Sequence, residues 1–187
     1  QVLEKFQQKE HDCITGKVSQ IEQGRGTVTI VYEGSELYLF RNEQIPGEVL
    51  TEGKDVKVYI TGILNKTKKP IVKISRTAKE LVKRLFETEV PEIYDGTVEI
   101  KSISREAGSR TKMAVWSNDA DVDAIGACIG PKRSRITAVV NELNGEKIDI
   151  IPWSENPREF IAKALAPAEV MKTVITSVEE KTCTVVV

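Results

Sequence analysis

Segments in which apolar and polar residues alternate fill the first part of the chain. They are rich in Val, Ile, Thr and Tyr and cover residues 14–22, 27–33, 36–41, 55–64 and 70–75. Alternation with a period of two predicts β-strands, and the polar stretches between the segments predict turns. Five short strands with an irregular insert after the third are typical of a small closed barrel of the OB type. We therefore expect an OB-type barrel over residues 12–76.

Helical spacing replaces the alternation on both sides of this barrel. Residues 1–11 have the pattern of the end of a connector helix. Leu81 and Leu85, four positions apart, predict a helix over residues 77–86 that follows the last strand without a glycine or proline between them. A junction of this composition is stiff rather than flexible. We expect the barrel and the next domain to keep a fixed orientation.

Residues 77–156 have the pattern of a second domain of α+β type. Strands are predicted at 97–104, 112–116 and 146–153, with a short helix, a tight loop and a longer helix between the last two. Residues 157–187 begin the same order of elements again, with one helix and two strands. The sequence therefore predicts a truncated second copy of the same domain at the end of the chain.

Composition narrows the class of protein without indicating a function. The chain has 27 Lys and Arg against 28 Asp and Glu, a net charge of −1, so a nucleic-acid site must be a local basic patch. No apolar run approaches the roughly 20 residues of a membrane helix, and the first residues do not have a signal-peptide pattern. Cys13, Cys128 and Cys183 are odd in number and lack metal-ligand spacing, which favours a reducing compartment. We expect a cytoplasmic protein that does not contact the membrane.

The predicted helix–loop–helix of the second domain carries the strongest functional signal. Gly130 opens a loop at the N-terminus of the longer helix, where backbone N–H groups and the helix dipole favour a phosphate. Lys132, Arg133 and Arg135 add side-chain cations at the same place. An apolar groove beside such a loop is how KH domains bind a few unstacked nucleotides. The pattern indicates a KH-type RNA site.

The predicted RNA site joins this loop to residues of both helices and of the following strand. Its members are Ile125, Gly126, Ala127, Ile129, Gly130, Pro131, Lys132, Arg133, Ser134, Arg135 and Ile136, with Ile148 or Ile150 from the strand. The alternative for the apolar members is that they only form the core, as Val139 and Leu143 do. Three cations within four positions favour binding at the loop itself.

The barrel has a second, weaker candidate surface for RNA. Tyr38 and Phe40 share one face of a strand, where an OB barrel stacks bases, although a role in the core fits the pattern equally well. A basic turn follows the fourth strand and contains Lys66, Lys68 and Lys69. These lysines either contact phosphates or are simply solvated. We expect the barrel to be an auxiliary RNA surface.

No residue pattern indicates catalysis, a cofactor or a metal. The single histidine, His11, lies beside acidic residues in the N-terminal connector and is most simply a solvated residue. A nucleophile elbow, a nucleotide-binding glycine loop and a metal-ligand cluster are all missing. Trp116 and Trp153, at strand ends, are best explained as packing residues. We expect a binding protein and not an enzyme.

Four further segments closely resemble the NusA family of bacterial transcription factors. In order after the barrel they are LVKRLFETEVPEIYDGTVEIK (81–101), IGACIG (125–130), VVNELNGEKIDIIPW (139–153) and NPREFIAKALAPAEV (156–170). The resemblance covers nearly the whole chain. It implies an OB barrel of the kind first seen in a ribosomal protein, followed by KH domains of the prokaryotic type, type II. It also implies an elongation factor that modulates pausing, termination and antitermination by binding nascent single-stranded RNA.

The resemblance implies partners as well. In the family these are RNA polymerase, bound mainly through an N-terminal domain that precedes the region seen here, and other termination and antitermination factors. We expect the chain itself to be a monomer. It should retain RNA binding and lose most of the affinity for polymerase.

One position departs from the family's loop pattern. The family usually has Gly-x-x-Gly, and the matching positions here are Gly130, Pro131, Lys132 and Arg133. Arginine adopts a positive φ less cheaply than glycine, so we expect a differently shaped loop. The extra charge can compensate, or the loop can bind RNA more weakly, and both alternatives stay open.

Two other classes of protein contain similar modules. The phosphorolytic exoribonuclease polynucleotide phosphorylase carries KH and barrel modules, but in the opposite order and after a large catalytic core. A ribosome-associated structural KH protein is the third possibility. A phosphate-dependent RNA degradation assay and ribosome co-sedimentation would separate these alternatives from a transcription factor.

Overall fold

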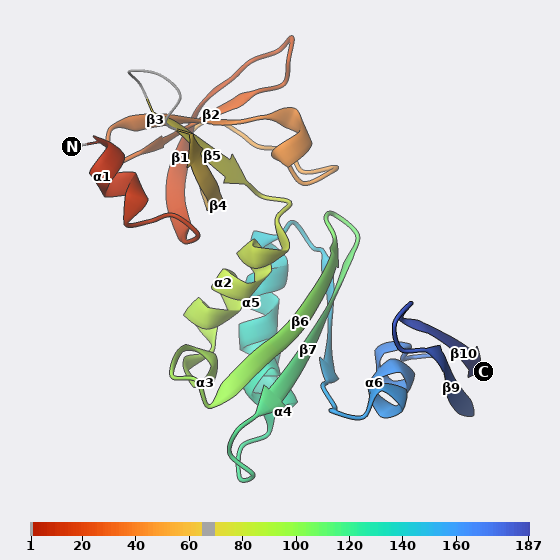
Figure 1. Ribbon diagram of the computed structural model, residues 1–187. Helices are drawn as coiled ribbons and strands as arrows, with labels where there is room; N and C mark the ends of the chain where they lie inside the picture. The colour runs from red at the N-terminus through yellow and green to blue at the C-terminus, as the bar shows by residue number, and fades with distance from the viewer. Residues whose placement is uncertain (1, 65–69) are drawn as a thin grey trace.

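The computed structural model describes residues 2–64 and 70–187 (Figure 1). Three units follow one another along the chain: a β-barrel, a central α+β domain, and a helix with a β-hairpin. In the part of the chain that is described, no helix is long and apolar enough to cross a membrane.

Five antiparallel strands form the barrel. They are β1 Cys13–Ile21, β2 Val28–Tyr32, β3 Ser35–Leu39, β4 Asp55–Leu64 and β5 Ile71–Ser75. Their order is β3-β2-β1-β4-β5, and β3 and β5 approach each other, so that the sheet nearly closes. Alternate side chains point inward, and Val18, Ile30, Leu39 and Ile60 are buried in the barrel core. The predicted OB-type barrel is confirmed.

The helix that precedes the barrel contributes to its core. This helix, α1, spans Val2–Gln7 and buries the side chain of Phe6, whose ring centroid lies 6.0 Å from that of Tyr32. From the sequence we predicted only the end of a connector helix here. The structure shows that the same helix closes one side of the barrel (Figure 1).

The central domain packs helices on one face of a three-stranded sheet. Its elements are α2 Lys79–Glu89, α3 Pro91–Tyr94, β6 Val98–Glu106, β7 Arg110–Ser117, α4 Ala124–Ile129, η2 Pro131–Arg133, α5 Ser134–Glu142 and β8 Lys147–Pro152. β6 and β7 are antiparallel, β7 and β8 are parallel, and β8 lies at one edge. Leu81, Phe86, Met113 and Leu143 are fully buried between helices and sheet. This order of elements confirms the predicted α+β KH domain.

The helical region after the barrel differs from the prediction in its length. The predicted helix over 77–86 is α2, which begins at Lys79 and continues to Glu89. The short helix α3 was not predicted. It begins at Pro91, whose fixed φ suits the first position of a helix and whose ring ends the helix before it.

The last unit is a helix followed by a β-hairpin. Its elements are α6 Pro157–Ala164, β9 Lys172–Ser177 and β10 Thr182–Val186, and β9 and β10 pair antiparallel. One helix and two strands are present as predicted. Met171 and Val178 are both 81% exposed. That this unit begins a second KH domain stays a prediction.

A buried arginine joins the barrel to the central domain. Arg76 donates through Nε and Nη2 to the carboxylate of Glu48, at 2.8 and 2.7 Å. Its Nη1 and Nη2 also donate to the side chain and the backbone carbonyl of Glu142, at 3.0 and 2.7 Å, and Nη1 donates to the carbonyl of Lys57 at 2.6 Å. Glu48 and Lys57 belong to the barrel and Glu142 ends α5. These contacts support the stiff junction that the sequence predicts.

A close backbone approach forms a second contact between the two domains. The β6–β7 turn reaches the insert of the barrel at Gly108, which has φ +80°. A Cβ atom there would lie 2.8 Å from the carbonyl oxygen of Pro46, so only glycine allows this approach. Ile45, from the same insert, is buried in the core of the central domain.

Glu146 makes a testable contribution to the stability of the central domain. Its buried carboxylate accepts hydrogen bonds from Arg105, from the hydroxyl of Thr111 at 2.7 Å and from the backbone of Gly108 at 2.8 Å. Hydrogen bonds to charged groups contribute about 1.5–3 kcal/mol each. Glu146→Gln should lower the free energy of unfolding by about that amount, because Arg105 then lacks its counter-charge. Urea denaturation followed by circular dichroism measures the change.

The neighbouring exposed carboxylate provides the control. Glu106 lies on the solvent side of β6, and Glu106→Gln should change stability by less than about 0.5 kcal/mol. Equal effects of the two substitutions would show that the buried carboxylate is not a stabilising centre.

Candidate nucleic-acid interface

The loop between α4 and α5 has an unusual backbone. Gly130, which ends α4, has φ 74° and ψ 171°, a conformation essentially confined to glycine. Lys132 and Arg133 follow with φ values of 52° and 61°, both in the left-handed region. The amide of Arg133 donates to the carbonyl of Gly130 at 3.1 Å. Three positive φ values within four residues turn the chain sharply into α5.

Arg133 stands at the position where the family's loop usually has glycine. The structure gives it φ 61° and ψ 21°, a positive φ that costs arginine more than glycine. A loop shape that differs from that of the family stays a prediction. A left-handed conformation costs a non-glycine residue about 1–2 kcal/mol. The side chain is exposed, so this cost is not offset by burial of the guanidinium.

The three cations of the loop have different roles in the structure. Lys132 and Arg133 are exposed, and no ion pair within residues 2–64 and 70–187 involves either of them. Arg135 instead donates through Nη1 to Glu92 at 2.9 Å and to the carbonyl of Ala127 at 2.8 Å. Arg135 therefore ties α5 to α3 and α4, which leaves Lys132 and Arg133 as the cations available to a phosphate.

A groove runs beside the loop along the edge of the sheet. It has a volume of about 370 Å³. Ile129 and Ile136 line it from the two helices, Arg133 from the loop, and Ile148 and Ile150 from β8. The structure thus brings together the loop and the apolar residues that the sequence predicts as one site.

Other predicted residues of the site do not line this groove. Ile125 and Ala127 are partly buried and pack against the core of the domain, as the groove residues Ile129 and Ile150 also do. Gly126 has a structural role: a Cβ atom there would lie 2.5 Å from Oδ2 of Asp123, the residue that caps α4 by accepting a hydrogen bond from the amide of Ile125. Their contact with RNA stays a prediction.

Sequence reasoning missed five residues that also line the groove. They are Arg110, Asp149, Ile151, Ala166 and Pro167. Arg110 and Asp149 form an ion pair across β7 and β8. Asp149 and Ile151 alternate with Ile148 and Ile150 along β8, so their side chains lie on the opposite face of the sheet. Because β8 is the edge strand, residues of both faces border the groove, and no local sequence signal reveals this.

Because β8 is an edge strand, some of its backbone N–H and C=O groups are available for hydrogen bonds with a ligand. Among the described residues, β8 pairs with β7 alone. The amides of Lys147 and Trp153 donate to β7 or to the turn before it, and strand alternation then turns those of Ile148 and Ile150 toward the groove. An unpaired strand edge presents N–H donors and C=O acceptors in a row, which can pair with the polar edge of a base.

The barrel presents two of its predicted aromatic residues to solvent. Tyr38 and Phe40 are 48% and 52% exposed. This exposure excludes the alternative in which they form the barrel core. Lys66, Lys68 and Lys69 lie outside the described residues.

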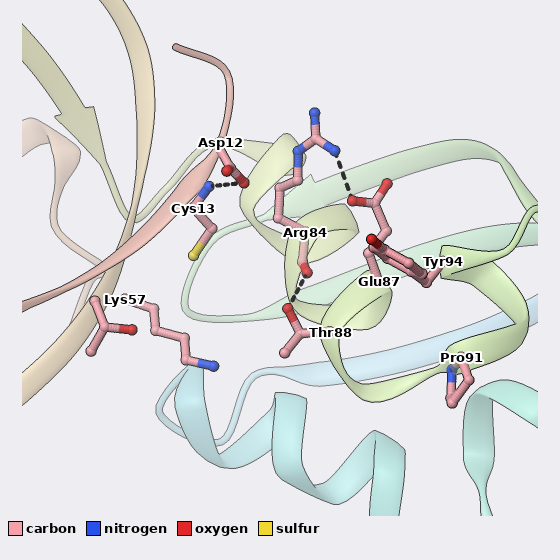
Figure 2. Close-up of a pocket in the computed structure, with 9 residues that line it drawn as sticks. Asp12, Cys13, Lys57, Arg84, Glu87, Thr88, Pro91 and Tyr94 are labelled. Carbon is pink, nitrogen blue, oxygen red and sulfur yellow. Dashed lines mark hydrogen bonds and ion pairs between the residues drawn. The ribbon is translucent and has the colours of Figure 1, made fainter. Parts of the chain in front are cut away.

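A cleft of about 620 Å³ separates the barrel from α2 and α3 (Figure 2). Arg84 of α2 donates through Nε to the backbone carbonyl of His11 at 3.0 Å and pairs with Glu87 of the same helix at 2.7 Å. Burial raises the pKa of the Cys13 thiol to about 11, so this thiol is protonated at neutral pH. Tyr94, which is 84% exposed, stands at the rim. The cleft shares no lining residue with the groove beside β8 and does not include the loop cations.

A second cysteine lies beneath the loop. Cys128 is on α4 and is fully buried in the domain core. Burial raises the pKa of its thiol to about 12. Cys128 is therefore a core residue and stays protonated at neutral pH.

Comparisons with known proteins agree with this geometry. A family model described as the NusA-like first KH domain matches residues 76–153. The transcription termination/antitermination protein NusA of Bacillus subtilis is 48% identical over 186 residues, which cover 100% of this chain and 49% of that protein. The protein of the same name from Thermus thermophilus is 46% identical over 90% of the chain and 43% of its own length, and that from Mycobacterium bovis is 39% identical over 97% of the chain and 54% of its own length.

The chain spans about half the length of the curated relatives it matches. The similarity nevertheless extends over the barrel, the central domain and the last helix and hairpin, since it covers nearly all of the chain. Over nearly its whole length the chain is therefore similar to curated NusA proteins, and its central domain matches the NusA-like first KH domain.

Proposed function

We propose that this chain binds single-stranded RNA with the α4–α5 loop on a phosphate and the neighbouring groove around one or more bases. The observation that carries the proposal is the position of two exposed cations, Lys132 and Arg133, which form no ion pair with the residues that the structure describes; Arg133 lines the neighbouring groove. Cations and helix N-terminal amides attract phosphate. Unstacked bases fit an apolar groove that a paired helix cannot enter.

The barrel extends this proposed surface. Tyr38 on β3 and Phe40 directly after β3 expose about half of their area, where bases can stack on them. Lys66, Lys68 and Lys69, which lie outside the described residues, are proposed to add phosphate contacts. Because Arg76 fixes the barrel to α5, both surfaces would act on one RNA strand in a set register.

The biological role of the whole protein is proposed from its relatives. These are named as transcription termination/antitermination proteins, which is the name of a transcription factor and not of an enzyme. We propose that the chain is the RNA-binding part of a cytoplasmic elongation factor that modulates pausing, termination and antitermination on nascent RNA. RNA polymerase and other termination or antitermination factors are its proposed partners, and the chain is proposed to be a monomer.

A charge reversal in the loop tests the proposal. Arg133→Glu should weaken binding of a labelled single-stranded RNA at least tenfold, because a phosphate contact becomes a repulsion. It should also reduce the slope of log Kd against log salt by about 0.7–1.4, the contribution of one or two phosphate contacts on a single strand. Fluorescence anisotropy across several salt concentrations measures both.

Lys83→Glu is the matched control. Lys83 is an exposed residue on α2, so the substitution changes the net charge equally while leaving the loop intact. The proposal fails if the two variants bind RNA equally well, since the loop would then add nothing beyond net charge.

A further inference from the structure

Two tryptophans lie together at one end of the sheet of the central domain. Trp116 is near the end of β7 and Trp153 directly follows β8. Their ring centroids are 5.6 Å apart and their planes are at 86°, an edge-to-face pair. Met113 and Val115 of β7 lie in the helix-side core, so alternation places Trp116 on the opposite face of the sheet, away from those helices.

The pair is partly open to solvent and has a cation beside it. Trp116 is 39% exposed. The ammonium of Lys101, on β6, lies 4.9 Å from the ring centroid of Trp153 and 2.8 Å from the carboxylate of Glu99. Packing explains the contact between the two rings, as the sequence predicts. It does not explain why the indole of Trp116 stays exposed.

The pair continues the strand that walls the groove. Ile151 lines the groove, and Trp153 is two residues further along. The amide of Trp153 still donates to the carbonyl of Val115, at 2.8 Å. Strand geometry separates the Cα atoms of Ile151 and Trp153 by about 7 Å and puts both side chains on one face. A nucleotide that flanks those in the groove can reach this end of the sheet.

We propose that Trp116 stacks a base of the same single-stranded RNA, next to the nucleotides held in the groove. This inference rests on the proposed function and extends its site. Aromatic residues on an open sheet face stack bases in other RNA-binding modules. Trp153 packs edge-to-face against Trp116, and Lys101 places positive charge over the ring of Trp153. Because every base has a π-face, this contact adds affinity without sequence preference.

Two RNA lengths separate this contact from the groove. Anisotropy is measured with a labelled RNA of about four nucleotides, enough for a KH groove, and with one of about eight. Trp116→Ala should weaken binding of the longer RNA about tenfold, as expected for one lost stack, and leave the shorter one unchanged. Trp116→Phe, which keeps an aromatic face, should restore most of the affinity. Tyr94→Ala removes an exposed aromatic residue in the separate cleft and should bind both RNAs as the unmodified chain does.

Each other outcome has a defined meaning. Stacking on Trp116 is overturned if Trp116→Ala binds both RNAs normally, if it weakens both equally, or if Trp116→Phe is as weak as Trp116→Ala. The proposed function, in contrast, fails if the unmodified chain binds neither RNA or if Arg133→Glu changes nothing. Thermal unfolding of Trp116→Ala and Trp116→Phe shows whether either variant has lost its fold. If the two variants have the same melting temperature, a difference in their RNA affinity is due to the lost aromatic face and not to a loss of stability.

Discussion

Replacing Arg76 by methionine should lower the free energy of unfolding by about 3–5 kcal/mol, the usual cost of removing one partner of a buried ion pair. The side chains of Arg76 and Glu48 are 1% and 2% exposed, and the bond between them is bidentate. Methionine fills the volume but leaves the Glu48 carboxylate buried without a counter-charge. Urea denaturation at neutral pH measures the loss.

The guanidinium of Arg76 keeps its positive charge in the folded protein. Burial alone would lower the pKa of its guanidinium, but the hydrogen bonds and charges of Glu48 and Glu142 outweigh that effect and raise the pKa above its ordinary value. The group therefore remains charged over the whole pH range in which the protein can be studied, and the stability it contributes does not depend on its own titration.

Two control variants make the effect of Arg76 interpretable. Arg84→Met removes a pair with Glu87 whose partners are 36% and 23% exposed, and such pairs contribute at most about 1 kcal/mol. Arg76→Lys keeps the charge but lacks the planar fork, so its loss should fall between those of the two methionine variants. If Arg76→Met were no less stable than Arg84→Met, the buried cluster would not hold the barrel and the central domain together.

Replacing Gly130 by alanine should weaken RNA binding at least tenfold and destabilise the chain by about 1–3 kcal/mol, the cost of forcing a side chain into a glycine-only conformation. The new Cβ would lie 2.5 and 2.8 Å from Cγ and Cδ of Arg135. Arg135 would have to leave Glu92 and the carbonyl of Ala127. The turn that presents Lys132 and Arg133 would then lose its anchor. RNA anisotropy and urea denaturation measure the two effects.

Gly145 offers a control for strain alone. It has φ +82°, and a Cβ atom there meets nothing within 4 Å. Gly145→Ala should therefore cost a similar amount of stability through the backbone, with RNA affinity unchanged. A Gly130→Ala variant that bound RNA as well as Gly145→Ala would show that the loop conformation does not govern binding.

Local patterns determined most of the elements of this protein. The five barrel strands follow from alternation between turn residues, and α5 follows from its apolar spacing and from the glycine after it. Alternation, helical spacing and a terminating glycine each involve only a few neighbouring residues, so they can be recognised in the sequence itself. The loop cations and the isoleucines of the groove were predictable for the same reason, since the order of elements brings a helix–loop–helix beside the next strand.

Other features depended on the tertiary structure. Glu48 and Glu142 lie 28 and 66 residues from Arg76, and no local pattern indicates that these three groups share one buried site. The sequence could not show that Arg135 is tied to Glu92 while Arg133 forms no ion pair with the described residues, or that Arg133 keeps a left-handed conformation. Which cation is free, which aromatic ring stays exposed and which turn meets the barrel depend on how distant segments pack. How these segments pack depends on the burial of apolar side chains and the pairing of polar groups over the whole chain. A short stretch of sequence therefore does not show it.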